Sequence, residues 1–256
     1  RNPVTAGDGS GTLVFDHVSF QYPDGEAPVL RDITFEARRG DTIAFIGSTG
    51  SGKSTLINLI PRFYDISSGS IRIDNVDVRR YDLKALREKI GFIPQKALLF
   101  TGSINENIRY GKHNAVQTEV EHSAKVAQAY DFITEKPKQF EEMIEEGGGN
   151  VSGGQRQRLS IARAVVRKPD IYIFDDSFSA LDFKTDANLR KQLKYETKDA
   201  ITLIVAQRVT SIMDATRIIV LNEGAVVGIG THRELLKTCS IYHEIALSQL
   251  SEEELA

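Results

Sequence analysis

The chain has 256 residues, with 32 Lys and Arg against 35 Asp and Glu, so its formal net charge is −3 and no cationic excess is available for a nucleic-acid backbone. A composition of 41% hydrophobic and 26% charged residues is that of a folded protein and excludes a disordered chain. The lone cysteine, Cys239, excludes an intramolecular disulfide and fits a reducing compartment.

The first part of the chain predicts a linker followed by strands. Residues 1–11 are rich in glycine and polar side chains, as a linker is. From Thr12 onward, two β-rich runs, TLVFDHVSFQY and PVLRDITFEA, predict antiparallel strands with a turn at Pro23-Asp24-Gly25. The apolar run Thr42–Ile46 predicts another strand, and a glycine-rich stretch then leads into a helix predicted over Ser54–Phe63.

The middle of the chain, from about Leu83 to Ala129, is predicted to be mainly helical because its apolar residues recur at helical spacing. A second glycine-rich stretch, Gly147–Gly154, precedes a helix predicted to run through Ala164. The remaining predicted elements are strands over Ile171–Asp175, Ile201–Val205, Arg217–Leu221 and Ala225–Ile229, a hairpin turn at Asn222-Glu223-Gly224, and helices near Asp182–Tyr195, Arg233–Lys237 and Tyr242–Leu250. This α/β alternation predicts a mostly parallel sheet covered on both faces, with an antiparallel addition and a helical lobe.

One glycine-rich stretch has the pattern of a phosphate-binding loop. Gly47-Ser48-Thr49-Gly50-Ser51-Gly52-Lys53-Ser54 matches G-x-x-x-x-G-K-[ST] and lies between a predicted strand and a predicted helix. Backbone N–H groups and the helix start favour a polyphosphate there. Lys53 can reach the β- and γ-phosphates, and the Ser54 hydroxyl can ligate Mg²⁺. A chance match in a flexible loop is the alternative, and the strand–loop–helix context argues against it.

A carboxylate is predicted beside this loop. The apolar run Ile171–Asp175 ends in an acid, and a buried parallel strand that ends in Asp can place its carboxylate beside a Mg²⁺ ion at the carboxyl edge of the sheet. The signal is weak alone, because many strands end in Asp, and strong in combination with the glycine-rich loop.

A third motif points to a family. Val151-Ser152-Gly153-Gly154-Gln155 resembles the L-S-G-G-Q signature of ATP-binding cassette (ABC) ATPases, with Val151 in place of Leu. A plain helix cap at Ser152 is the alternative. The resemblance extends from Thr12 to about Leu250. It implies an α/β P-loop NTPase core with a mostly parallel sheet, an antiparallel β subdomain and a helical subdomain at approximately 96–168, all within one nucleotide-binding domain at 12–256.

The resemblance also implies roles for individual residues, with ATP and Mg²⁺ as cofactors. Tyr22 resembles the aromatic residue that stacks on adenine, and Gln95 the glutamine that touches Mg²⁺ and meets a transmembrane partner. The run LFTGSINENI at 99–108 resembles exporter-type cassettes, Ser179-Ala180-Leu181-Asp182 a D-loop, and 230–235 the closing element of such domains. The implied ATP-binding residues are Tyr22, Gly47, Ser48, Thr49, Gly50, Ser51, Gly52, Lys53, Ser54 and Thr55, with Ser152, Gly153, Gly154 and Gln155 acting on a partner's nucleotide; the Mg²⁺ ligands are Ser54, Gln95 and Asp175, and the catalytic residues Asp176, Gln207 and Gln95.

Two positions depart from the pattern of an efficient ABC ATPase. The family's usual general base, a Glu, is replaced by Asp176, which is one methylene shorter, and general-base catalysis is worth roughly 10²–10⁴-fold. The usual switch histidine is replaced by Gln207, which can donate a hydrogen bond but cannot carry charge. Both departures fall on one phosphate site, so the chain resembles the degenerate half of a heterodimeric exporter with a slowly hydrolysing site of its own.

The implied partners are a second, non-identical nucleotide-binding domain and transmembrane domains fused upstream, at the cytoplasmic face of the cell membrane. The chain starts at Arg1 without Met, which indicates a piece of a longer polypeptide. Alternatives are a homodimeric exporter ATPase with a weak Asp base and a regulatory ATP-binding module without turnover. A cassette ATPase of chromosome or translation work would carry a coiled-coil insertion or a second cassette, and the sequence has neither. The transported substrate is not encoded here, because membrane helices select it.

Overall fold

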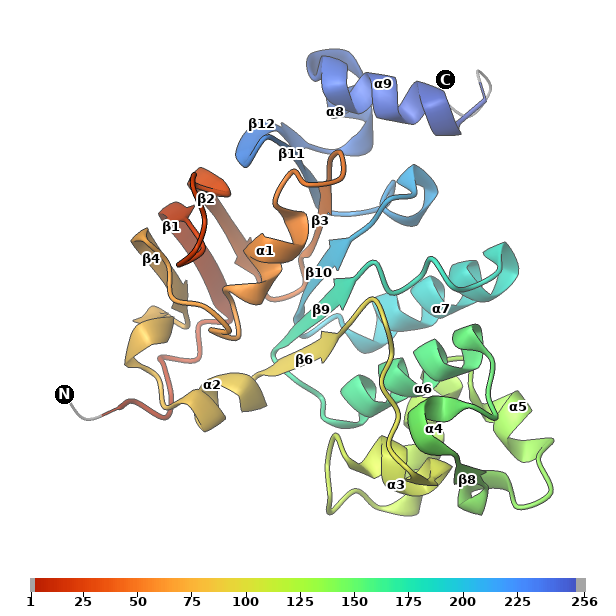
Figure 1. Cartoon of the computed structure of the whole chain (residues 1–256). Coiled ribbons are helices and arrows are strands. Elements are labelled where there is room, and N and C mark those ends of the chain that lie inside the picture. The colour runs from red at the N-terminus through yellow and green to blue at the C-terminus, as the bar shows by residue number, and fades with distance from the viewer. Residues whose placement is uncertain (1–2, 252–256) are drawn as a thin grey trace.

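A six-stranded sheet forms the centre of the computed structural model, which describes residues 3–251 (Figure 1). Its strands follow the order β12-β11-β3-β10-β9-β6, and all except the edge strand β12 run parallel. Their bounds are β3 (Thr42–Ile46), β6 (Ile90–Ile93), β9 (Ile171–Asp175), β10 (Ile201–Val205), β11 (Arg217–Asn222) and β12 (Ala225–Gly230). Every residue of β10 is buried, as expected for a parallel strand covered on both faces. The predicted mostly parallel sheet is confirmed.

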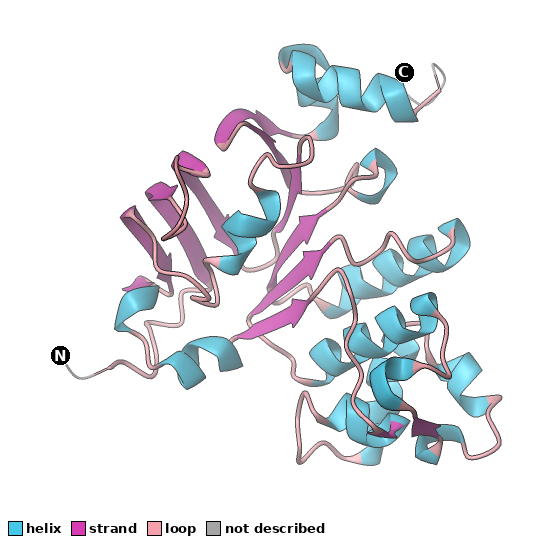
Figure 2. Ribbon diagram, viewed as in Figure 1, coloured by secondary structure: helices cyan, strands magenta, loops and turns pink. Residues whose placement is uncertain are grey.

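A second, antiparallel sheet has the order β2-β1-β4-β5 and covers one face of the first (Figures 1 and 2). The two predicted strands, β1 (Thr12–Phe20) and β2 (Leu30–Arg38), pair as expected. Strands β4 (Ser68–Ile73) and β5 (Val76–Asp77) had no clear signal, because β4 begins Ser-Gly-Ser and only its last four residues alternate between half-buried and buried. A third, two-stranded sheet pairs β7 (Gly102–Ser103) with β8 (Met143–Ile144).

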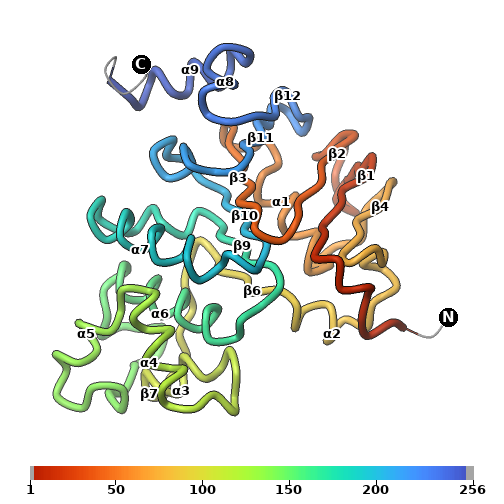
Figure 3. Tube along the Cα trace, turned by 180° about the vertical axis from the view of Figure 1, so that it is seen from behind, coloured from red at the N-terminus to blue at the C-terminus, as the bar shows by residue number. Residues whose placement is uncertain are grey.

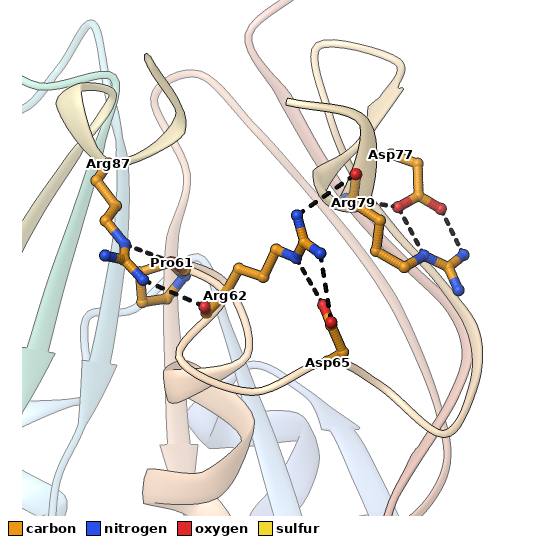
Figure 4. A network of polar contacts seen from close by, with 6 residues as sticks. All are labelled: Pro61, Arg62, Asp65, Asp77, Arg79 and Arg87. Carbon is orange, nitrogen blue, oxygen red and sulfur yellow. Dashed lines mark hydrogen bonds and ion pairs between the residues drawn. The ribbon is translucent and has the colours of Figure 1, made fainter. Parts of the chain in front are cut away.

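Helix α1 covers Lys53–Asn58, so the prediction of a helix to Phe63 is wrong at its carboxyl end. Pro61 has no amide hydrogen and disfavours a helical conformation in the residue before it. Arg62 takes a φ of 56°, which turns the chain away. Arg87 then donates from Nε to the Pro61 carbonyl oxygen at 3.1 Å and from Nη2 to that of Arg62 at 3.3 Å (Figure 4). Two carbonyl groups of this turn are thus bound from α2 (Leu83–Glu88).

The network in Figure 4 continues from this turn to the antiparallel sheet. Arg62 donates to both carboxylate oxygens of Asp65, at 2.6 and 3.3 Å, and this interaction lowers the pKa of Asp65. Arg62 also donates to the carbonyl oxygen of Arg79 at 3.4 Å, while Arg79 pairs with Asp77 at 2.6 Å. The segment after α1 is therefore fastened to β5 by charged groups.

The predicted helical stretch from Leu83 to Ala129 is interrupted by β6 and β7, so it is wrong as a continuous helical region. Ile90–Ile93 joins the parallel sheet because a buried edge position beside β9 outweighs the helical spacing. The remaining helices are α3 (Ile104–Arg109), α4 (Gln117–Val126), α5 (Tyr130–Thr134), α6 (Gly153–Val166), α7 (Phe183–Glu196), α8 (His232–Thr238) and α9 (Ser240–Gln249), with 3-10 turns η1 (Val78–Arg80), η2 (Gln139–Glu141), η3 (Glu146–Gly148) and η4 (Val209–Ser211).

Buried apolar residues form two clusters on opposite faces of the parallel sheet. One joins the antiparallel sheet and α1 to side chains such as Phe45 and Ile173. The other joins α6, α7 and α9 to side chains such as Phe174 and Ile204. Helices α3 to α6 gather at one end of the molecule, away from α1, in both the front and back views (Figures 1 and 3).

The described part of the predicted linker lies against the fold. The Val4 amide donates to Arg80 O at 2.8 Å, and the Gly11 amide donates to the Asp74 carboxylate at 2.8 Å. Between residues 3 and 251, no helix combines the length and apolar character needed to cross a membrane.

Candidate functional site

Four neighbouring parallel strands deliver the predicted site residues to one edge of the central sheet. The loop 47–54 follows β3, and Asp175 and Asp176 lie at the end of β9. Gln207 and Gln95 each come two positions after the last residue of their strands, β10 and β6. Because these strands are parallel and adjacent, their carboxyl ends meet at the same edge, where open α/β sheets bind ligands. The sequence-based grouping of these residues is therefore reproduced by the topology.

Lys53 lies inside the curl of the loop that precedes it. Its Nζ donates to the carbonyl oxygen of Gly47 at 2.7 Å, to that of Ser48 at 2.9 Å and to the Ser51 hydroxyl at 3.3 Å. These groups hold the ammonium at the centre of the loop, beside residues 48–50, which are exposed. The loop thus holds a cation close to its exposed backbone.

Glycines are required in this loop for two different reasons. A Cβ atom at Gly47 would lie 2.2 Å from the carbonyl oxygen of Leu221, so only glycine permits the close approach of β11. Gly50 and Gly52 have φ values of 80° and 101°, which side chains disfavour. Space beside Gly50 is open, with no atom within 4 Å of a Cβ built there. The loop is thus shaped to leave its outer backbone uncovered.

The side chains of Ser54 and Asp175 bring two oxygen atoms together at the end of the loop. Ser54 Oγ donates to Asp175 Oδ1 at 3.1 Å. Burial raises the pKa of Asp175, and the Ser54 hydrogen bond and the charge of Lys53 oppose that shift. Burial likewise lowers the pKa of Lys53, opposed by the charges of Asp176 and Asp175. A hydroxyl and a carboxylate are ligands that Mg²⁺ prefers, so this donor pair fits the ion.

Asp176 is buried at 8% exposure and takes a φ of 47°, unusual for a residue with a side chain. Gln95 Nε2 donates to its Oδ2 at 3.1 Å, and the Asp176 amide donates to Val205 O at 2.8 Å. Burial and the neighbouring charge of Asp175 raise the pKa of Asp176, with the Gln95 hydrogen bond opposing them. A carboxylate held in this way is a stronger base than an exposed one.

Tyr22 lies beside Thr55 of helix α1, and its adenine-stacking role stays a prediction. Its hydroxyl and the Thr55 hydroxyl are 2.9 Å apart, so α1 and the loop after β1 meet here. The Tyr22 ring packs edge-on against Phe20 and Tyr64, with centroid distances of 4.8 and 5.1 Å. The ring is half-buried, which leaves part of its surface to solvent.

Residues 152–155, which resemble the ABC signature, lie at the start of helix α6. This helix belongs to the group formed by α3 to α6, apart from the phosphate loop (Figure 1). Ser152 caps the helix: Gln155 N donates to Ser152 Oγ and Ser152 N to Gln155 Oε1, both at 3.1 Å. The cap considered as an alternative is therefore present, and it leaves Ser152 and Gly153 exposed. Within residues 3–251 these residues do not join the loop.

Two polar residues near the site were assigned no role from the sequence. Arg208 Nη2 donates to the Ser179 carbonyl oxygen at 3.1 Å, and its guanidinium lies 5.1 Å from the centroid of the Phe183 ring. Gln249 Nε2 donates to the carbonyl oxygen of Gln207 at 2.7 Å. Arg208 follows Gln207 directly, which was a usable signal; nothing local marks Gln249.

Comparison with known proteins identifies the family. A family model described as "ABC transporter" matches residues 30–179, more than half of the chain. The chain belongs to the ABC transporter family. The α/β fold of ABC-type P-loop NTPases predicted from the sequence is thereby confirmed, and ABC ATP-binding domains are in general ATPases.

The chain is similar to several longer proteins, some of which are named as exporters. A Bacillus subtilis protein named "Uncharacterized ABC transporter ATP-binding protein YfiB" is 45% identical over 95% of this chain and 42% of its own length. A Staphylococcus aureus protein, provisionally named a multidrug export ATP-binding/permease protein, is 45% identical over 92% of this chain and 41% of its own. The solved structure of a bacterial Atm1-family ABC exporter with ATP bound superimposes with a TM-score of 0.93 at 34% identity, covering 98% of this chain and 44% of that one. The chain thus spans less than half the length of the relatives it matches.

Proposed function

We propose that this chain is the ATP-binding cassette of an exporter at the cytoplasmic face of a membrane, and that it closes around ATP with a second cassette. The observation that carries the proposal is the meeting of Lys53, the Ser54–Asp175 pair and Asp176 at one edge of the parallel sheet. In this proposal 12–256 is the nucleotide-binding domain, with a helical subdomain at approximately 96–168. The names of the export relatives and the ATP-bound exporter structure support it.

In the proposed site each residue has one task. Lys53 and the backbone of residues 47–52 bind the β- and γ-phosphates, and Tyr22 stacks on adenine. Ser54, Asp175 and Gln95 would hold a Mg²⁺ ion, which supplies charge neutralisation on the phosphate oxygens when bound. Asp176 accepts the proton of the attacking water, and Gln207 donates a hydrogen bond to the γ-phosphate. Ser152, Gly153, Gly154 and Gln155 complete the site of the partner.

We further propose that hydrolysis at this chain's own site is slow. Asp176 is one methylene shorter than Glu, and its backbone is fixed by the bond of its amide to Val205 O, so its carboxylate stays back from the water position. Gln207 is neutral at every pH. A non-identical partner with Glu and His at these positions would then supply the faster site.

The first experiment is MgATP binding to the 256-residue chain by calorimetry, with Lys53→Ala as the test variant. The ammonium makes charge-assisted bonds to phosphate, so its loss should weaken binding by about tenfold or more. Lys198→Ala, an exposed lysine preceding β10 at the opposite end of that strand, is the control and should bind as the parent does. Equal affinity of the parent and Lys53→Ala would refute the assignment of residues 47–54 as a phosphate-binding loop.

The homodimeric alternative is tested by ATPase activity with and without a candidate partner cassette. Activity of this chain alone should stay below about 1 s⁻¹, the low end of typical enzyme rates, and rise when the partner is added. In the pair, Gly154→Asp should abolish hydrolysis, while Asp176→Asn should cost much less. Equal losses from both variants would favour the homodimer.

A further inference from the structure

The side chain that ends the C-terminal helix holds the backbone on both sides of Arg208. Gln249, the last residue of α9, donates from Nε2 to Gln207 O at 2.7 Å and accepts from Val209 N at Oε1 at 2.8 Å. An amide group offers both a donor and an acceptor in one plane, so a single side chain can bond the carbonyl and the N–H of two residues. The position of Gln207, just beyond the end of β10, is thereby tied to α9.

From this loop, contacts continue to the segment that follows Asp176. Arg208 donates to Ser179 O at 3.1 Å and lies over the exposed ring of Phe183. Ser179 Oγ in turn donates to the carbonyl oxygen of Asp176 at 3.1 Å. Within residues 3–251, the second terminal nitrogen of Arg208, Nη1, is buried without a hydrogen-bond partner. The guanidinium position therefore depends on the Arg208 backbone and on one hydrogen bond. A shift of that backbone would change the contact with Ser179.

Helix α9 is a firm support for this contact. Tyr242 and Ala246 are fully buried, and Tyr242 OH lies 2.6 Å from Nδ1 of the buried His232. Helix α9 lies beside η4, at the end of the molecule away from helix α6 (Figure 1). Gln249 thus extends from a packed helix, although its own side chain is exposed.

We propose that Gln249 is a positioning residue, through which helix α9 sets the placement of Gln207 and, by way of Arg208, of the segment after Asp176. The C-terminal helix would then tune the response of the site to the γ-phosphate without touching nucleotide. This inference rests on the proposed roles of Gln207 and Asp176. It predicts that changes at Gln249 alter binding of ATP and leave binding of ADP unchanged, because only ATP carries the γ-phosphate.

The test compares MgATP and MgADP affinities of the 256-residue chain by calorimetry. Gln249→Met keeps the shape of the side chain and removes both bonds, and it should weaken MgATP binding by about three- to tenfold. MgADP binding should be unchanged. Ser248→Ala is the matched control, because Ser248 is also exposed on α9 and its hydroxyl donates to Ile245 O within the helix. Equal loss of both nucleotides, or loss of neither, would overturn the proposal.

A charged variant separates hydrogen bonding from packing. Gln249→Glu keeps the acceptor for Val209 N but directs a second oxygen at Gln207 O, which repels it. Protonation restores a donor, and the ordinary pKa of Glu is about 4.3, so MgATP affinity of Gln249→Glu should recover toward that of the parent between pH 6 and pH 4, after each is normalised to the same pH. Gln249→Met should show no such recovery. Identical pH profiles for the two variants would contradict a role in positioning.

Hydrogen exchange tests the proposal even where nucleotide binding itself is lost. In Gln249→Met, amides of both 206–211 and 176–183 should exchange severalfold faster than in Ser248→Ala. An effect confined to 206–211 would mean that Gln249 holds only its immediate neighbours. Failure of the parent chain to bind either nucleotide would refute the proposed function, and the exchange pattern would still test the positioning role of Gln249 independently.

Discussion

Gln95 donates its side-chain amide to the carboxylate of Asp176 at 3.1 Å, although 81 residues separate the two in sequence. Gln95 follows β6 and Asp176 follows β9, and these strands are neighbours in the sheet. The bond therefore links the proposed base to the segment that leads from β6 to helix α3. It holds the carboxylate in one orientation and opposes the rise in its pKa that burial causes.

Lengthening this base should restore part of the hydrolysis. In Asp176→Glu the carboxylate moves forward by one methylene, closer to the position of an attacking water, so turnover at this site should rise. We expect a gain below tenfold, because Gln207 still cannot carry charge. Steady-state phosphate release by the chain measures it, with Asp199→Glu, an exposed acid at the far end of β10, as the control. A gain of tenfold or more would mean that the length of Asp176 was the only defect.

Removing the charge of Asp176 should stabilise the protein without nucleotide. Burial and the charge of Asp175 raise the folded-state pKa of Asp176 above its ordinary value of 3.8, so the folded state binds the proton more tightly than the unfolded state. Stability conferred by this group therefore falls as pH rises from about 3.8 through the raised pKa, and the ionised carboxylate is a cost at neutral pH.

Asp176→Asn should accordingly raise the melting temperature at pH 7 by about 2–4 °C. The difference should shrink as the pH falls toward 4, where the parent carboxyl becomes neutral. Thermal unfolding at several pH values measures it, with Asp199→Asn as the control. A variant that melts below the parent at pH 7 would show that the Gln95 bond outweighs the cost of burying the charge.

A methyl group at Gly47 should displace the phosphate loop from β11. The Cβ atom of Gly47→Ala would lie 2.2 Å from Leu221 O and 2.8 Å from Ser51 Oγ, so the backbone must shift. We expect a loss of about 1–3 kcal/mol in the free energy of unfolding, measured in urea. Gly153→Ala is the control, because the nearest atom to its Cβ, Arg156 Nη2, is 3.9 Å away. Equal stability of Gly47→Ala and the parent would refute the close approach of β11.

The C-terminal helices should loosen in acid. Burial lowers the pKa of His232 in the folded state, as does the nearby charge of Arg233, while Asp214 opposes the shift. The folded state then binds fewer protons than the unfolded one. Stability from this group is complete above the unfolded value of about 6.5 and is lost as pH falls below it toward the lowered pKa.

Between pH 7 and pH 5 the free energy of unfolding should therefore fall more in the parent than in His232→Gln, which has no proton to bind. Urea unfolding at the two pH values tests this. His243→Gln, which removes an exposed histidine of α9, should keep the pH dependence of the parent. A parent-like dependence in His232→Gln would assign the acid sensitivity to other groups.

The parts of the site that sequence inspection predicted are those encoded by local pattern. The loop 47–54 and the acid at the end of β9 follow from strand periodicity and glycine spacing, because parallel strands must bring their carboxyl ends together. Helix α1 was predicted too long, because the apolar spacing of its sequence continues past Pro61 while the hydrogen bonds cannot. Strand β4 was missed because its pairing with β1 compensates for a weak local signal.

Long-range side-chain contacts were beyond prediction for a different reason. Gln249 bonds backbone groups of residues about forty positions away, and backbone groups carry no sequence signature. Arg87, which closes the turn after α1, is likewise defined by the position of two carbonyl groups rather than by any motif. Such contacts depend on how helices and strands pack against one another in the folded protein.

The distribution of the site over separate strand ends has a consequence for how such chains diverge. The ladder that joins β3, β10 and β9 is made of backbone hydrogen bonds, which do not depend on the side chains beyond the strand ends. Lys53 can therefore stay while Asp176 and Gln207 change, and the sheet remains the same. Side chains at the strand ends can thus differ from one cassette to another while the sheet that positions them stays unchanged.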